Sequence, residues 1–93
     1  MRLTPAEQKA ITEAIDDADG DAAIYLFGSR ANGRAKGGDI DLLVLSRKID
    51  LMKKLDILAQ LHRQLGDQRI DLLVYPDLSQ TFARLARDSG VPL

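Results

Sequence analysis

The most constraining feature of this 93-residue sequence is a pair of polar clusters, each placed where an apolar run meets water. The first cluster, Gly-Ser-Arg at 28–30, follows the apolar run 22–27. The second, Asp-Ile-Asp at 39–41, opens an apolar run that continues to residue 45. Short apolar runs bounded by turn residues are typical of buried strands. The pattern therefore predicts two strands whose polar ends lie at one site.

Asp39 and Asp41 lie two residues apart on the second predicted strand, so their side chains point to the same face. Neighbouring carboxylates repel each other unless a cation lies between them. Their hard oxygens suit Mg²⁺, which commonly takes one or two carboxylates together with substrate phosphates. Asp71, near the start of a later strand, would complete this site and help to activate an incoming hydroxyl. We therefore expect Asp39, Asp41 and Asp71 to be the metal ligands and catalytic residues of a site for a nucleoside triphosphate, where a pair of ions can serve the attacking and leaving oxygens.

The first polar cluster predicts a phosphate-binding turn. Gly28 permits close backbone approach, and Ser29 begins a short helix with free N–H groups. Those groups, together with the Ser29 hydroxyl, can hold the outer phosphates of a nucleotide. Arg30, Arg34 and Lys36 add positive charge nearby, and we take Arg30 as a third nucleotide-binding candidate. Each of these three cations is an equally good candidate for solvated surface.

Length and composition limit the remaining options. Residues 1–93 suffice for one domain, and a hydrophobic content of 45% supports a core. A formal net charge of −1 argues against direct nucleic-acid binding, which favours a clustered basic excess. Cysteine is absent, which excludes disulfides and thiolate metal sites. No apolar run approaches the roughly 20 residues of a membrane span, and the N-terminus reads as a helix rather than a leader. We expect a soluble cytoplasmic domain.

Periodicity and capping residues predict an α/β fold. Thr4 and Pro5 are typical of a helix start, and Gly20 of its end. Asp50 and Gly66 bound a longer helix in the same way. The expected elements are a helix over 5–18, a strand over 22–27, a short helix over 29–33 before a loop at 36–38, a strand over 39–45, a helix over 51–65 with an apolar stripe at Leu51, Leu55, Leu58, Leu61 and Leu65, a strand over 69–75, and a last helix capped by Asp77 or Ser79 and ending at Gly90.

A single site fixes the strand directions. The glycine turn ends the first strand, whereas Asp39 starts the second, so these two strands should run antiparallel. Asp71 lies near the start of the third strand, so this strand should run parallel to the second. The long helix between them is the crossover that a parallel pair requires. We therefore expect a mixed sheet.

These residues resemble the nucleotidyltransferase superfamily that includes DNA polymerase β, and the short length resembles its minimal nucleotidyltransferases (MNT), the antitoxins of HEPN–MNT toxin–antitoxin pairs. The resemblance covers nearly the whole chain. It implies a polymerase β palm-like fold, with a mixed sheet of three or slightly more strands and about four helices. It also implies two Mg²⁺ ions, with Mn²⁺ as a substitute, at Asp39, Asp41 and Asp71, and triphosphate contacts at Gly28 and Ser29. Gly38 departs from the serine that the family often has there.

The resemblance implies transfer of a nucleoside monophosphate, AMP from ATP in the leading interpretation, to a hydroxyl of a partner HEPN toxin. The chain would thereby act as an antitoxin. The alternative is a nucleotide-binding or purely masking antitoxin that neutralises its partner without catalysis. Leu78, Phe82 and Leu85 would either pack on the sheet or form an interface with a partner or a second copy of the chain.

Overall fold

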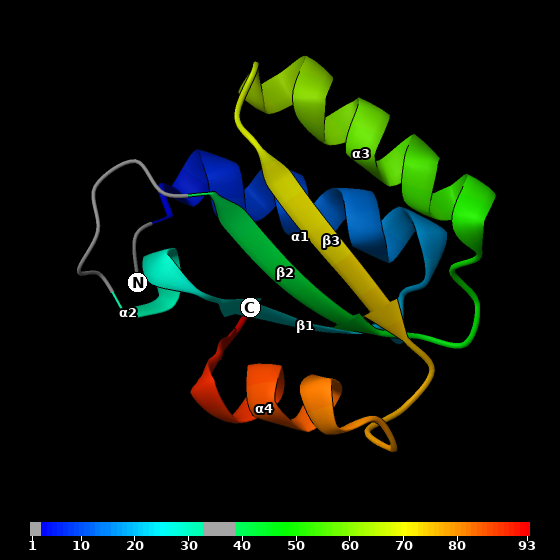
Figure 1. Cartoon of the computed structure of the whole chain (residues 1–93). Coiled ribbons are helices and arrows are strands. Elements are labelled where there is room, and N and C mark those ends of the chain that lie inside the picture. Colours follow the sequence, from blue (N-terminus) through cyan, green and yellow to red (C-terminus); the bar gives the residue numbers. More distant parts are fainter. Residues whose placement is uncertain (1–2, 33–38) are drawn as a thin grey trace.

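The computed structural model describes residues 3–32 and 39–93 of the chain (Figure 1). Within these residues, strands form one mixed sheet in the order β3-β2-β1-β4, with helices on both faces. The α/β class expected from the sequence is confirmed. In chain order the elements are α1 (Pro5–Ala18), β1 (Ala23–Phe27), α2 (Ser29–Asn32), β2 (Ile40–Leu45), α3 (Leu51–Leu65), β3 (Ile70–Tyr75), α4 (Thr81–Ser89) and β4 (Val91–Pro92).

The strand directions agree with the prediction. β1 and β2 pair antiparallel, which sets Phe27 opposite Asp41. β2 and β3 pair parallel, which sets Asp41 opposite Asp71. α3 provides the crossover between the parallel strands, as Figure 1 shows above the sheet. The register thus places two aspartates from different strands side by side at one end of the sheet.

The first helix begins with a reciprocal capping box. The Glu7 N–H donates to Thr4 Oγ1 at 3.0 Å, and the Thr4 N–H donates to Glu7 Oε1 at 2.9 Å. Pro5 occupies the first helical turn, where its missing N–H has no partner to lose. The helix ends at Ala18, as the predicted span of 5–18 has it, and its C-cap is Asp19 rather than Gly20, with the Asp19 N–H donating to the Ile15 carbonyl. The start of α1 is therefore fixed by two hydrogen bonds that involve Glu7.

The side chains of the sheet divide into two hydrophobic clusters. One face, with Leu26 and Leu42, packs against α1 and α3, where Ile11 and Leu61 are fully buried. The other face is covered by α4, and there Leu43 packs with two alanines of that helix. Because side chains alternate along a strand, Asp41 lies on the α4 face, two residues before Leu43. The carboxylates therefore project from the less covered side of the sheet.

Two features of the C-terminal part differ from the sequence-based expectation. The predicted caps of the last helix are wrong, because Gln80 precedes α4 and makes no side-chain capping bond. Asp77 instead accepts from the Ser79 N–H at 2.9 Å and forms an ion pair with Arg47. The sequence also did not predict β4, whose Val91 pairs with Leu26 of β1. Helix α2 starts at the expected residue, whereas Gly33 and the loop at 36–38 lie outside the described residues.

In the described part of the chain, no helix is both long enough and apolar enough to cross a membrane.

The predicted apolar stripe of α3 reaches the core only in part. Leu61 is fully buried and Leu58 partly buried, whereas Leu51 and Leu55 remain exposed. The buried positions of this helix are Ile57 and Leu61.

We expect Gly90→Ala to destabilise the fold, since an added Cβ would lie 2.7 Å from the Ala86 carbonyl oxygen and 3.0 Å from that of Leu26. Overpacking of this kind costs about 1–3 kcal/mol. Gly20→Ala is the matched control, because its Cβ would approach no atom closer than the Asp16 carbonyl oxygen at 3.9 Å. Urea denaturation measures both free energies of unfolding. Equal effects of the two substitutions would contradict this account of Gly90.

Candidate functional site

The glycine turn lies directly against one of the predicted carboxylates. Gly28 follows β1 with a φ of +75°, a conformation that side chains disfavour. A Cβ at this position would collide with Asp41 Oδ2 and would lie 3.1 Å from Asp41 Cγ. The turn closes into α2 through a hydrogen bond from the Ala31 N–H to the Gly28 carbonyl at 3.2 Å. Glycine is therefore required both by the backbone conformation and by the carboxylate beside it.

The structure brings the three predicted aspartates together. Asp41 lies in β2 in register with Asp71 of β3, and Asp39 lies immediately before β2. The side chains of Asp39 and Asp71 remain 46% and 44% exposed. The group is therefore open to solvent and to a ligand approaching from outside the sheet.

Arg69 is a site residue that the sequence analysis missed. Its Nε lies 3.6 Å from Asp39 Oδ2 and 3.7 Å from Asp71 Oδ1, so one guanidinium joins two of the predicted ligands. The sequence did offer a signal for Arg69: it lies two residues before Asp71, and side chains two residues apart in an extended chain point to the same side. Its side chain is largely exposed, and exposed ion pairs of this length contribute little to stability. Arg69 can therefore leave the carboxylates when another cation binds.

The pKa of Asp41 is raised by burial and by the neighbouring carboxylates. Burial raises it most, and a hydrogen bond with Asp71 and the charges of Asp71 and Asp39 raise it further. The positive charge of Arg69 opposes these effects only partly, and the pKa reaches about 6. A divalent cation would relieve this repulsion, so the donor set fits Mg²⁺.

The carboxylates do not form a complete metal cage by themselves. Among the described residues, no group of three or more acidic, histidine or cysteine side chains is arranged to hold a metal ion. This arrangement agrees with the usual coordination of Mg²⁺, which takes few protein ligands and completes its shell with phosphates and water. A Mg²⁺ ion held by these aspartates would need further ligands, such as phosphate oxygens or water.

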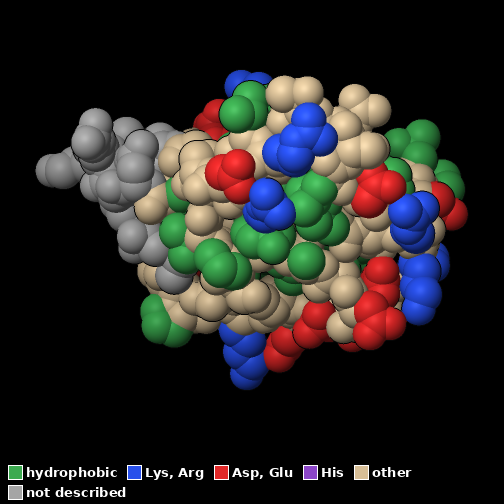
Figure 2. All heavy atoms as spheres, turned by 90° about the horizontal axis from the view of Figure 1, so that it is seen from below, with side chains coloured by type: hydrophobic (Ala, Val, Ile, Leu, Met, Phe, Trp, Pro, Cys, Tyr) green, Lys and Arg blue, Asp and Glu red, His purple; other side chains and the backbone are tan. Residues whose placement is uncertain are grey.

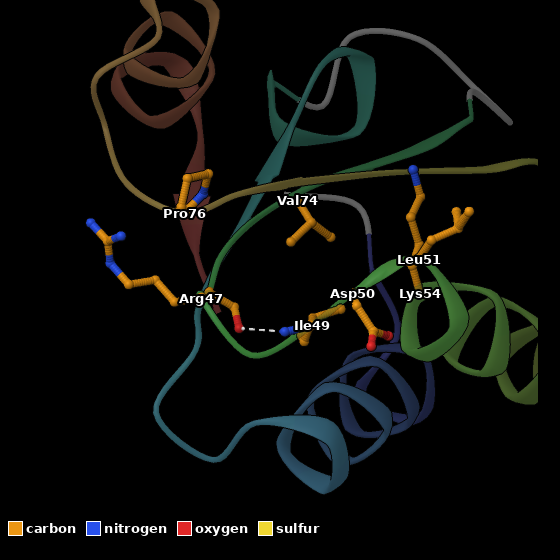
Figure 3. Close-up of a pocket in the computed structure, with 8 residues that line it drawn as sticks. Arg47, Ile49, Asp50, Leu51, Lys54, Val74 and Pro76 are labelled. Carbon is orange, nitrogen blue, oxygen red and sulfur yellow. Dashed lines mark hydrogen bonds between the residues drawn. The ribbon is translucent and has the colours of Figure 1, made fainter.

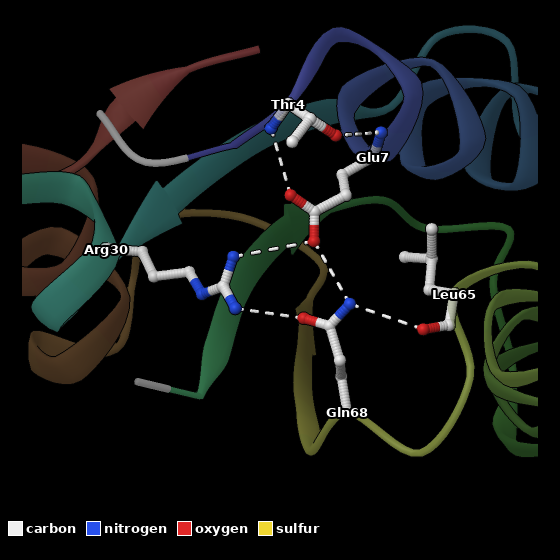
Figure 4. Close-up of polar contacts among 5 residues, drawn as sticks. All are labelled: Thr4, Glu7, Arg30, Leu65 and Gln68. Atoms are coloured by element: carbon white, nitrogen blue, oxygen red, sulfur yellow. Dashed lines mark hydrogen bonds and ion pairs between the residues drawn. The ribbon is translucent and has the colours of Figure 1, made fainter. Parts of the chain in front are cut away.

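Of the three cations predicted near the glycine turn, the structure describes only Arg30. The guanidinium of Arg30 is turned toward Glu7 and Gln68, as Figure 4 shows, and its side chain is only 13% exposed. Its predicted contact with a nucleotide stays a prediction. Arg34 and Lys36 lie outside the described residues, as does Gly38. Ser29 is the first residue of α2, at the position that the sequence predicted.

A hollow of about 440 Å³ adjoins the carboxylates. Phe27 and Phe82 line it and meet edge to face, with ring centroids 6.0 Å apart. The full lining is Phe27, Asp41, Lys54, Leu58, Ile70, Asp71, Leu72, Leu73 and Phe82. Two of the three aspartates thus border a mainly apolar space large enough for a side chain or a base.

A second hollow, of about 430 Å³, lies at the far end of β3 and includes Val74 and Pro76 (Figure 3). Lys54 lines both hollows, and Figure 3 shows its side chain extending from α3 toward β3. It is a cation that the sequence analysis did not select. The helical periodicity of α3 could not have shown that this lysine lines the same hollow as Asp41 and Asp71.

Comparison with known proteins identifies the class. The family described as polymerase β nucleotidyltransferases matches residues 9–93, and the chain belongs to this family. Among curated proteins, none matches the chain. The resemblance inferred from the sequence is therefore confirmed for the family.

Two solved structures with the same fold are toxin–antitoxin proteins. A toxin–antitoxin with AMP-PNP aligns with a TM-score of 0.72 and 25% identity, over 91% of this chain and 70% of that one. A mutant of the toxin–antitoxin MntA-HpeT aligns with a TM-score of 0.73 and 25% identity, over 97% of this chain and 72% of that one. The chain is thus similar to minimal nucleotidyltransferases of toxin–antitoxin systems over nearly its whole length.

We expect Asp41→Asn to raise the stability of the metal-free protein at neutral pH, by about 1 kcal/mol at most because the group is partly solvated. The folded state binds the Asp41 proton more tightly than the unfolded chain does. The destabilisation caused by burial of this charge and by the neighbouring carboxylates is therefore absent below pH 3.8 and complete above a pH of about 6. Thermal melts of both proteins from pH 4 to 8 with EDTA measure the difference. A constant difference across this range would contradict the assigned pKa.

Proposed function

We propose that this chain transfers AMP from ATP to a hydroxyl of a partner protein and thereby acts as an antitoxin. The observation that carries the proposal is the contact of the Gly28 turn with Asp41, which is itself in register with Asp71. Because the turn contacts one carboxylate of the pair, a phosphate-binding turn and two carboxylates could act on the same triphosphate. The membership of the nucleotidyltransferase family supports the same reaction class.

The residues of the chain would divide the reaction between them. N–H groups at Gly28 and Ser29 would hold the outer phosphates, and Asp39, Asp41 and Asp71 would hold two Mg²⁺ ions. Bound Mg²⁺ supplies charge neutralisation on the phosphates and a lowered pKa for the acceptor hydroxyl. The acceptor oxygen forms a bond to the α-phosphorus, the bond to the bridging oxygen breaks, and pyrophosphate leaves. Asp71 would take the hydroxyl proton or pass it to water.

The similar structures support ATP and a toxin as ligands of this chain. One of them is a toxin–antitoxin with AMP-PNP, an analogue of ATP. The other is a mutant that carries two Asp-to-Glu substitutions. Both observations concern those proteins, and we extend them here to propose ATP and a HEPN-family toxin as the ligands.

The surface beside the site favours an acceptor on another polypeptide. Phe82 lines the hollow next to Asp41 and Asp71 and is still 47% exposed. Leu85, one helical turn further along α4, is 61% exposed, whereas Leu78 packs partly against the sheet. Figure 2 shows apolar side chains gathered on this side of the molecule, between acidic and basic ones. A partner or a second copy of the chain could cover this surface and present its hydroxyl to the hollow.

The main experiment is transfer of label from α-labelled ATP to the co-expressed partner with Mg²⁺. We expect Asp39→Ala combined with Asp41→Ala to reduce transfer at least about a hundredfold, as loss of charge stabilisation does elsewhere. Asp16→Ala with Asp17→Ala is the matched control, since both carboxylates are exposed near the end of α1. Equal transfer by the wild type and the site variant would refute the catalytic proposal.

The same variants separate catalysis from masking. If the partner stays neutralised by the site variant although transfer is lost, the chain acts as an antitoxin by binding alone.

A separate melting experiment tests the metal. A melting-temperature shift that ATP produces equally with EDTA and with Mg²⁺ would show that the aspartates do not hold a metal.

A further prediction concerns the surface of α4. We expect Leu85→Lys to weaken transfer to the partner about tenfold or more, because a charge would have to be desolvated at the interface. Binding of Mg²⁺ with AMP-PNP should remain at the wild-type level. Met52→Lys is the control, an equally drastic change at a residue that is 66% exposed on α3. Transfer that is insensitive to Leu85→Lys would place the acceptor on another surface.

A further inference from the structure

Glu7 lies at the centre of a polar network that joins three segments of the chain (Figure 4). Its Oε2 accepts from Arg30 Nη1 at 3.5 Å and from Gln68 Nε2 at 3.1 Å. Arg30 Nη2 in turn donates to Gln68 Oε1 at 2.9 Å. Gln68 Nε2 also donates to the Leu65 carbonyl at 3.3 Å. The three side chains thus form a closed ring of hydrogen bonds between the start of α1, helix α2 and the connection between α3 and β3.

The ring is shielded from solvent and strongly polarised. The side chains of Glu7 and Arg30 are each only 13% exposed. Burial raises the pKa of Glu7, but hydrogen bonds from Thr4 and Gln68 and the charge of Arg30 outweigh burial and lower it overall. Glu7 is therefore an ionised group in a partly buried setting, where charge-assisted hydrogen bonds fix geometry well.

Two of the joined segments carry the proposed site. Helix α2 contains Arg30 and begins immediately after Gly28, the turn that lies against Asp41. Gln68 directly precedes Arg69, whose carbonyl accepts from the Ile40 N–H at 3.0 Å, where β3 begins to pair with β2. A displacement of Arg30 or Gln68 would therefore move the phosphate-binding turn or the entry to β3.

We propose that Glu7, Arg30 and Gln68 are positioning residues that hold the phosphate-binding turn in register with Asp71. This inference rests on the proposed function and deepens it. It gives Arg30 a role through other residues, in addition to the direct phosphate contact suggested by the sequence. The first turn of α1, which is distant from the carboxylates in sequence, becomes part of the support of the site.

The network could instead serve stability alone, and the choice of variants separates these roles. Glu7→Gln keeps the side-chain shape and an acceptor for the Thr4 N–H, but removes the charge that faces Arg30. Thr4→Ala is the stability control, because it removes the hydroxyl that caps α1 and leaves the ring intact. Glu7→Gln combined with Gln68→Glu returns a carboxylate to Arg30 from the other side of the ring.

The first readout is amide hydrogen exchange without nucleotide. The Ala31 amide reports on the glycine turn, and the Ile40 amide reports on the entry to β3. The Asp19 amide, at the far end of α1, is the reference. We expect Glu7→Gln to accelerate exchange at Ala31 and Ile40 about tenfold relative to Asp19, as loss of a charged hydrogen bond predicts.

The second readout is the dissociation constant for AMP-PNP with Mg²⁺. We expect Glu7→Gln to weaken binding about tenfold, and the double variant to recover most of that loss. Thr4→Ala should lower the melting temperature without changing either the affinity or the relative exchange rates.

Outcomes of the two readouts distinguish failure of the inference from failure of the proposed function. If Thr4→Ala and Glu7→Gln change exchange and affinity in proportion to their loss of stability, the network is merely structural and the inference is wrong. If the wild type binds no nucleotide, the proposed function fails, but site-specific exchange at Ala31 and Ile40 still decides whether the ring positions the turn and β3.

Discussion

The organisation of this small domain depends on the contact between a backbone turn without a side chain and the Asp41 carboxylate. Gly28 allows this contact because it adopts a positive φ and leaves room where any Cβ would collide. The contact sets the end of β1 against the start of β2, and the parallel pairing of β3 then adds Asp71. Antiparallel and parallel pairing within one sheet both converge on this point, so the mixed topology is what assembles the site.

The clustering of like charge has a thermodynamic consequence. Burial raises the pKa of Asp41 most, and the hydrogen bond and charge of Asp71 and the charge of Asp39 raise it further. Arg69 compensates this negative charge in part, at distances above 3.5 Å from Asp39 and Asp71. Residues placed in this way lower the stability of the free domain and favour a cationic ligand. Such a local conflict between stability and arrangement is typical of functional sites.

The sequence predicted the elements and the proximity of the three aspartates, because these depend largely on local signals. Short apolar runs, the Thr4 cap and the Gly66 stop act within a few residues, and a two-residue spacing fixes a common face for Asp39 and Asp41. The inward orientation of Arg30 depends on Glu7 and Gln68, which are 23 and 38 residues away in sequence. Likewise β4 forms only because β1 offers it a free edge, so two residues with no strand signal of their own become a strand.

The parallel pairing of β2 and β3 also determines when the site can exist during folding. The turn and the first two aspartates can come together in a hairpin of β1 and β2, which is local in sequence. Asp71 joins them only after α3 has crossed the sheet and β3 has docked, a step with a larger loop-closure cost. Among the described strands, β3 has a neighbour on one side only, so fraying of this strand would remove Asp71 and Arg69 while the hairpin persists. Loss of the complete carboxylate set can therefore precede global unfolding, and activity would report on the integrity of the last strand to pair.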